Sequence, residues 1–166
     1  MARGTRFRLA AVLVTACAAS ACGYQASSAQ AGRTAPASTD TKQIIVYIRS
    51  AKVPKVGTVL VNAAGRTLYV FAPDKAKRVT CNSGCQSFWP AATLPTHAIL
   101  KAEGSVKQSL LGTDPNPVSH ERVVTYNGWP LYTYLGDSAS GQANGQNLNQ
   151  TGGYWWVMRP NGEILR

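Results

Sequence analysis

The sequence predicts a mostly β protein, with a small single domain of two related β-hairpin or meander repeats and little helix. Short runs of β-branched and aromatic residues alternate with turn residues, and one motif recurs at an offset of 63 residues. A length of 166 residues excludes large multidomain enzymes. We expect a lipoprotein signal peptide at 1–21, a disordered, flexible tether at 22–41 and a β-rich domain at 42–166, with repeat copies near 56–90 and 122–157.

Residues 1–21 have the composition of a secretory signal. Arg3, Arg6 and Arg8 make the first eight residues basic, and the apolar run 9–16 follows. This run is far shorter than the roughly 20 residues of a membrane-spanning helix. A basic segment, a short apolar segment and small residues are typical of a signal peptide, so we expect an extracytoplasmic protein.

The signal ends near a cysteine. The segment Ala19–Gly23 resembles a bacterial lipobox, in which the cysteine, here Cys22, is lipidated and becomes the first mature residue. Val14–Cys17 is a rival box that starts with a branched residue. Processing at Cys17 leaves Cys22 as an unpaired thiol in an oxidising compartment, whereas lipidation of Cys22 removes Cys17 with the signal. The cysteine count therefore favours Cys22, and a plain secretory signal is the remaining alternative.

Residues 22–41 are expected to form a flexible tether. They are small and polar without apolar periodicity, so burial of their side chains cannot offset the entropy cost of folding.

The protein is basic. The chain has 17 basic and 7 acidic residues, and loss of residues 1–21 leaves 14 basic residues and a net charge of +7. The excess indicates either attraction to anionic lipid headgroups or envelope polymers, or a solvated basic surface. No nucleic-acid recognition motif is present, and we expect no nucleic-acid partner.

In the first half of the domain, β-branched and aromatic runs predict strands at 43–49, 56–62 and 67–71. A four-residue turn with a glycine, 63–66, joins the last two into a hairpin. In the third run, Tyr69 and Phe71 share one face while Leu68 and Val70 share the other. A strand that is apolar on both faces is expected at a central position.

In the second half, strands are predicted at 122–126, 129–135, 154–158 and 163–165. Asn127-Gly128 between the first two is a strong hairpin signal, and Pro160-Asn161-Gly162 predicts a turn between the last two. Helix is expected only as short turns near 85–89 and 105–111.

One motif occurs twice. The segment Leu68–Asp74 matches Leu131–Asp137, and both spell Leu-Tyr-x-aromatic-x-x-Asp. Each copy follows a strand and a glycine-containing turn, and each precedes a turn-rich stretch and a tryptophan, Trp89 or the pair Trp155-Trp156. The repetition predicts that the two halves are duplicated β-hairpin units.

These motifs together resemble a family of bacterial secreted lipoproteins with a Tyr-x-(Phe/Trp/Tyr)-x-x-Asp repeat, often called secreted repeats of unknown function. The resemblance extends from about Val56 to Gly162. It includes the paired cysteines before Trp-Pro in 81–90, the segment 125–132, and Asp137 followed by the Gly-Gln pairs 141–142 and 145–146. The resemblance implies a location and an architecture, but no biochemical activity.

The repeat motif has a structural and a functional interpretation. Asp74 and Asp137 each follow a strand end, where an aspartate can accept backbone N–H bonds in an Asx-turn or bond a tyrosine hydroxyl. Alternatively, two tyrosine–aspartate pairs line a cleft for a ligand or an electron-transfer partner. The motif residues under either interpretation are Tyr69, Phe71, Asp74, Tyr132, Tyr134 and Asp137.

Cys81 and Cys85 can close a short disulfide loop if the chain turns at Ser83-Gly84, with roughly 2 kcal/mol of stabilisation. The alternative is a copper or zinc site formed with His97 or His120. Sco-type copper chaperones have a similar cysteine spacing, but on a thioredoxin-like scaffold that this sequence does not predict. We expect no resident metal or cofactor.

Aromatic residues give the one positive indication of binding. Seven of the 14 Phe, Trp and Tyr residues lie between Tyr126 and Trp156, beside the Gly/Asn/Gln-rich loop 136–153. Trp129, Tyr154 and Trp155 are candidates for an exposed surface that stacks on sugar rings or packs a protein partner. In a small β domain, the alternative is that most of these rings form the core.

Sequence signatures of catalysis are missing. The chain has no Gly-x-Ser-x-Gly elbow, His-Glu-x-x-His helix or phosphate-cradling glycine loop, and no close carboxylate pair stands out. We therefore expect a lipid-anchored, non-catalytic binding or envelope-associated module. Its expected partners are the membrane, through the N-terminal lipid, and anionic envelope polymers or an envelope protein. The rival hypothesis is a redox or copper-handling protein centred on Cys81 and Cys85.

Overall fold

The computed structural model describes residues 42–74 and 78–166, and these residues form one compact unit. The expectations for the signal peptide 1–21, for lipidation at Cys22 or Cys17 and for the tether 22–41 fall outside the described residues. In the described part, no helix has the length and apolar character needed to cross a membrane.

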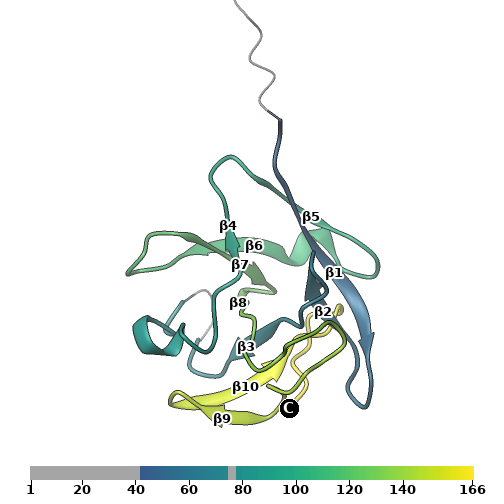
Figure 1. Cartoon of the computed structure of the whole chain (residues 1–166). Helices are drawn as coiled ribbons and strands as arrows, with labels where there is room; N and C mark the ends of the chain where they lie inside the picture. Colours follow the sequence, from purple (N-terminus) through teal and green to yellow (C-terminus); the bar gives the residue numbers. More distant parts are fainter. Residues whose placement is uncertain (1–41, 75–77) are drawn as a thin grey trace, which may run out of the picture. The chain divides into compact units, whose positions relative to one another are not determined.

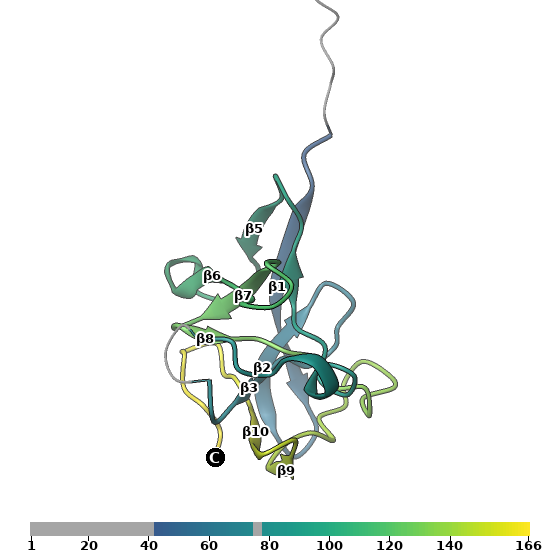
Figure 2. The ribbon, with the colours of Figure 1, turned by 90° about the vertical axis from the view of Figure 1, so that its left-hand side faces the viewer.

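Three small sheets build the domain (Figure 1). The first has the order β2-β1-β5, with β1 at Ile45–Val53, β2 at Gly57–Asn62 and β5 at Ile99–Ala102. β1 pairs antiparallel with β2 through a tight turn and parallel with β5. Figure 2 shows β1 as the long strand of this sheet, with β5 beside its first half.

The other two sheets are antiparallel. The second has the order β3-β10-β9, with β3 at Tyr69–Phe71, β10 at Gly153–Val157 and β9 at Leu148–Gln150. In the third, β7 at Arg122–Tyr126 pairs with three partners. These are β6 at Leu111–Pro115, β4 at Thr93–Leu94 and β8 at Trp129–Pro130.

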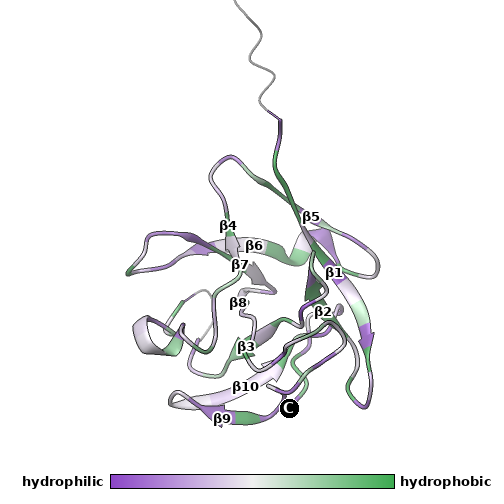
Figure 3. Cartoon of the chain, in the orientation of Figure 1, coloured by the Kyte–Doolittle hydropathy of each residue, from purple (hydrophilic) through white to green (hydrophobic). Residues whose placement is uncertain are grey.

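β3 lies between two hydrophobic clusters. Leu68 and Val70 belong to one cluster, and Tyr69 and Phe71 belong to the other. The backbone of this strand also has two neighbours, because Tyr69 pairs with Val157 of β10 and bridges to Tyr132. The expected apolar surroundings on both faces are confirmed, but the central position is not, because β3 is the end strand of the β3-β10-β9 sheet and its second neighbour is a single bridge. Figure 3, which colours the chain by hydropathy, shows β2 as hydrophobic and the loop between β6 and β7 as hydrophilic.

The Asn127-Gly128 hairpin is confirmed. The two residues join β7 to β8 and have φ angles of 49° and 81°. Positive φ at both central positions is what a two-residue type I′ turn requires, and Asn-Gly adopts it at low cost. The turn at Pro160-Asn161-Gly162 also forms, through a hydrogen bond from Gly162 N–H to the Arg159 carbonyl.

Several predicted bounds were wrong. The strand expected at 129–135 ends at Pro130. Leu131 still donates a hydrogen bond to Val124 of β7, and Tyr132 then pairs with Tyr69 and Ala91 instead. Residues 163–165 form no strand and contribute only a bridge from Ile164 to Met158. Strands β4, β5, β6 and β9 were not predicted. The two expected helical turns are single 3₁₀ turns, η1 at Ser83–Cys85 and η2 at Gln108–Leu110.

Candidate functional site

The two copies of the repeat motif meet at their tyrosines. Tyr69 N–H donates to the Tyr132 carbonyl at 2.8 Å, and Tyr132 N–H donates to the Tyr69 carbonyl at 3.0 Å. This reciprocal antiparallel pair relates the two motifs by an approximate two-fold rotation. Equivalent bonds recur on both sides of it: Asp74 N–H bonds the Phe71 carbonyl at 3.0 Å, and Asp137 N–H bonds the Tyr134 carbonyl at 3.1 Å.

Each tyrosine hydroxyl bonds the aspartate of the other copy. Tyr69 Oη donates to Asp137 Oδ2 at 2.6 Å, and Tyr132 Oη donates to Asp74 Oδ2 at 2.5 Å. All four side chains are buried, with exposed fractions of 1% or less. The motif therefore joins the two halves of the domain, and we call these two bonds the cross-repeat pairs.

The second carboxylate oxygen of each aspartate holds the loop that follows it. Asp74 Oδ1 accepts hydrogen bonds from the backbone N–H of Thr80 at 2.7 Å and from its hydroxyl. Asp137 Oδ1 accepts the backbone N–H of Asn144 at 2.8 Å. Both roles of the structural interpretation, backbone bonding and tyrosine bonding, thus occur in each aspartate. The alternative of an open cleft lined by the pairs is wrong, because the pairs are buried.

Burial raises the pKa values of Asp74, Tyr69 and Tyr132. Burial raises the pKa of the Asp74 carboxyl, and the hydrogen bonds from Thr80 and Tyr132 offset part of this effect. The pKa values of Tyr69 and Tyr132 are raised above the usual tyrosine range. Burial is the main cause, and the negative charge and hydrogen bond of the neighbouring aspartate are the second. In the described residues the single ion pair is between Arg49 and Glu103, so no cation neutralises either buried carboxylate.

An aromatic stack lies beside the cross-repeat pairs. Trp89 and Trp155 are parallel, with ring centroids 3.9 Å apart and an interplanar angle of 1°. Phe71 stacks on the outer face of Trp155 at 4.3 Å, and Tyr134 stacks on Trp89 at 4.1 Å. In the order Phe71, Trp155, Trp89, Tyr134, the four rings come alternately from the first and the second half of the sequence. We call this group the aromatic stack.

The motif tyrosines and one glutamine complete the surroundings of the stack. Tyr69 meets Trp89 edge to face at 5.3 Å, and Tyr132 meets Trp155 in the same way at 5.2 Å. Gln150 satisfies both indole N–H groups, since Trp89 donates to its side-chain oxygen and Trp155 to its backbone oxygen. The stack is therefore part of the core, and both of its indole N–H groups are paired.

Trp155 was wrongly predicted to lie on an exposed aromatic surface. Its side chain is fully buried in the stack. Tyr154 is 45% exposed and stacks on Trp156, while Trp129 is half-buried against the other hydrophobic cluster. The alternation of a strand explains the error, because Trp155 and Val157 share the inner face of β10 and Tyr154 points the other way. Of the three candidate residues, Tyr154 is the exposed one.

The predicted disulfide between Cys81 and Cys85 is confirmed, with the Cα atoms 5.3 Å apart. Cys81 is buried in the cluster that contains the aromatic stack. His97 and His120 are exposed residues with positive φ angles. Within residues 42–74 and 78–166, no group of three or more His, Cys, Asp or Glu side chains could hold a metal ion. Nothing in the structure supports the copper-handling hypothesis.

One basic hollow was not predicted from the sequence. It has a volume of about 420 Å³ and is lined by Thr58, Ser105, Lys107 and residues 159–161. These residues come from three segments that are distant in sequence, so no local motif indicates them. The spacing of basic residues along the chain contained no signal that could have identified this hollow.

Comparison with known proteins places the two repeats in one family. A family model described as "secreted repeat of unknown function" matches residues 50–93 and 121–159. The two matches contain the two motif copies, and they include Trp89 and Trp155 of the aromatic stack. No curated protein and no solved structure matches the chain. Since the matched segments cover half of the chain and contain both halves of the cross-repeat pairs, the chain belongs to this family of secreted repeats of unknown function.

Proposed function

We propose that this protein is a lipid-anchored extracytoplasmic module that binds anionic components of the cell envelope without catalysing a reaction. The family is described as secreted, which agrees with a location outside the cytoplasm.

The charge of the exposed surface is the observation that carries the proposal. The described residues include eleven basic and six acidic side chains. Two of the six acids, Asp74 and Asp137, are buried, and Glu103 is paired with Arg49. The exposed or half-buried basic residues are Lys42, Arg49, Lys52, Lys55, Arg66, Arg78, Lys101, Lys107, Arg122, Arg159 and Arg166. Burial of acids in the core makes the surface more basic than the sequence total indicates, which favours anionic partners.

The non-catalytic part rests on how the reactive side chains are used. Cys81 and Cys85 are bonded to each other, and Tyr69 and Tyr132 are each bonded to an aspartate inside the core. Catalytic acids, bases and nucleophiles need access to a substrate. Asp74, Tyr69 and Tyr132, whose pKa values are raised by burial, lie inside the core without access to a substrate.

The anchor rests on the lipobox-like segment Ala19–Gly23. Membrane fractionation of cells that express the full chain tests it. We expect the Cys22→Ala variant to move to the soluble fraction, while the matched Cys17→Ala variant stays with the membrane. Unchanged membrane retention of Cys22→Ala would remove Cys22 as the lipid site.

The anionic partner is tested with the mature chain carrying Cys22→Ser, which keeps every described residue. We expect this protein to bind a soluble glycerol phosphate polymer and not a neutral polysaccharide of similar length. The affinity should fall steeply between about 50 and 500 mM salt, because the screening length shortens from about 14 Å to about 4 Å. Equal binding to both polymers, or binding that is independent of salt, would refute an electrostatic role for the surface.

A further inference from the structure

We infer that the hollow between Lys107 and Arg159 is a binding site for the phosphate group of an envelope phosphodiester. This inference rests on the proposed function and assigns a specific site to it. The hollow of about 420 Å³ is lined by Thr58 from β2, by Ser105 and Lys107 from the connection between β5 and β6, and by the turn that follows β10. Its volume lies within the range of small-ligand sites, so it admits a phosphate together with the groups on either side.

A buried hydroxyl fixes two walls of this hollow to each other. Tyr126 Oη accepts the backbone N–H of Lys107 at 2.9 Å and donates to the carbonyl of Pro160 at 2.6 Å. The Tyr126 side chain is fully buried. The segments that carry Lys107 and Arg159 are therefore held in place before any ligand arrives, which lowers the entropic cost of binding.

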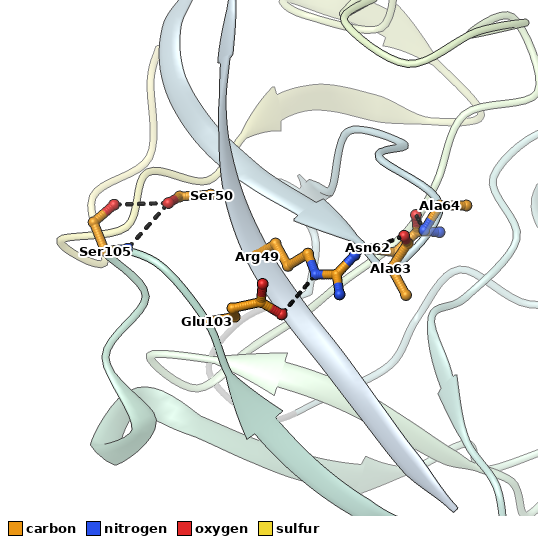
Figure 4. A network of polar contacts seen from close by, with 7 residues as sticks. All are labelled: Arg49, Ser50, Asn62, Ala63, Ala64, Glu103 and Ser105. Carbon is orange, nitrogen blue, oxygen red and sulfur yellow. Dashed lines mark hydrogen bonds and ion pairs between the residues drawn. The ribbon is translucent and has the colours of Figure 1, made fainter.

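A pair of serines holds the connection between β5 and β6 against the β1–β2 hairpin. The Ser50 hydroxyl, from β1, accepts the Ser105 backbone N–H at 3.1 Å, and the Ser105 hydroxyl donates to it at 2.9 Å (Figure 4). This close approach depends on Gly104, whose φ is +71°, since a Cβ there would lie 2.7 Å from the Ser50 hydroxyl oxygen. Ser105 is thus joined to the β1–β2 hairpin that carries Thr58.

Basic side chains outnumber acids around the hollow. Lys107 and Arg159 form no ion pair within the described residues. Glu103 lies two residues before Ser105, and its carboxylate is paired with Arg49 (Figure 4). Lys52 lies opposite Thr58 in the β1–β2 ladder, so both side chains leave the same face of the hairpin. Glu163 also lies near the lining, and its carboxylate accepts a hydrogen bond from the Asn161 amide at 2.7 Å. The lining itself contains two cations, Lys107 and Arg159, and no acid.

The combination of donors fits a phosphate. Arg159 is a half-buried residue whose guanidinium supplies a planar fork of N–H donors that matches phosphate oxygens, and Lys107 adds a point charge. Thr58 adds a hydroxyl donor to the lining, whereas the single proton of the Ser105 hydroxyl is already donated to Ser50. A tetrahedral anion with several acceptor oxygens can use donors from three directions, whereas a planar carboxylate offers acceptors in one plane.

The test compares two charge-matched double variants of the mature Cys22→Ser chain. Lys107→Gln with Arg159→Gln neutralises the hollow, and Lys101→Gln with Arg122→Gln neutralises two basic residues outside it. We expect the first variant to lose at least about tenfold in affinity for the glycerol phosphate polymer, and the second less than about threefold. Thermal unfolding of each variant checks that the fold is retained.

The outcomes separate this inference from the proposed function. Equal losses in the two double variants would refute the site while leaving a basic binding surface in place. Absence of polymer binding by the parent protein would refute both. Vesicles with and without phosphatidylglycerol, together with inorganic phosphate alone, distinguish a lipid headgroup from a free phosphate as the source. Backbone amide shifts in NMR must change at Ser105, Lys107 and Asn161 when the phosphate probe is added, and unchanged shifts there would also refute the site.

Discussion

Removal of the Tyr132 hydroxyl should destabilise the domain by about 2 kcal/mol. In the Tyr132→Phe variant, the buried Asp74 carboxylate loses a donor at 2.5 Å and gains no water, because both side chains are inaccessible. Hydrogen bonds to charged groups are worth about 1.5–3 kcal/mol. Urea unfolding measured through tryptophan fluorescence gives the change in unfolding free energy directly.

The matched control for this variant is Tyr154→Phe. Tyr154 is 45% exposed, and substitutions of this kind usually change stability by less than about 0.5 kcal/mol. If Tyr132→Phe is no more destabilising than this control, the cross-repeat pair does not stabilise the fold and the interpretation of the motif is refuted.

The same variant has a predicted pH dependence. Burial raises the folded-state pKa of Asp74 above its unfolded value, so its favourable contribution is complete below the unfolded pKa of about 4 and is lost as the pH rises through the folded pKa. Loss of the Tyr132 donor raises the folded pKa further. Tyr132→Phe should therefore destabilise more at pH 7 than at pH 4. A destabilisation that is larger at pH 4 would contradict this sign.

Three further predictions concern the same core. Because the pKa values of Tyr69 and Tyr132 are raised in the fold, stability should fall above about pH 10 by up to about 1.4 kcal/mol per pH unit for each tyrosine; urea midpoints that are flat between pH 9 and 11 would contradict this. Replacement of both disulfide cysteines by alanine should cost about 2 kcal/mol in urea unfolding, and an unchanged midpoint would show that the short loop adds nothing. Gly145→Ala should cost about 1–3 kcal/mol, because the new Cβ would lie 2.6 Å from the Trp89 ring. Its control is Gly84→Ala, where the Cβ meets nothing within 4 Å, and equal effects of the two changes on thermal unfolding would argue against close packing at Gly145.

Local features of the fold were predictable from the sequence, because each depends on neighbouring residues. The Asn127-Gly128 turn requires two positive φ angles, and the doubly apolar Leu68–Phe71 run requires burial on both faces. Strands β5 and β6 were missed for a physical reason. Both lie at sheet edges, and β6 contains Gly, Asp and Pro, which are uncommon in strands.

The partners of the motif residues were not predictable from one sequence. Tyr69 is followed by Asp74 and Tyr132 by Asp137 at the same spacing, so pairing within a copy and pairing across copies satisfy the pattern equally. In the structure, the reciprocal backbone hydrogen bonds between Tyr69 and Tyr132 bring each tyrosine next to the aspartate of the other copy. The basic hollow depends on the same tertiary arrangement, since its lining comes from three distant segments.

A double-mutant cycle separates these two pairings. The coupling energy between Tyr132→Phe and Asp74→Asn should be about 1–2 kcal/mol, whereas Tyr69→Phe and Asp74→Asn should be nearly additive. A larger coupling within one copy than across copies would mean that the halves are not joined in this way.

We propose that the repeat motif stabilises the core while the basic surface binds the anionic partner. The affinity of Tyr132→Phe for the glycerol phosphate polymer, measured at a temperature where the variant is fully folded, tests this division directly. We expect an affinity within about twofold of the parent protein, in contrast to the loss expected for Lys107→Gln with Arg159→Gln. A tenfold or greater loss in folded Tyr132→Phe would contradict the division, because the motif itself would then be part of the binding site.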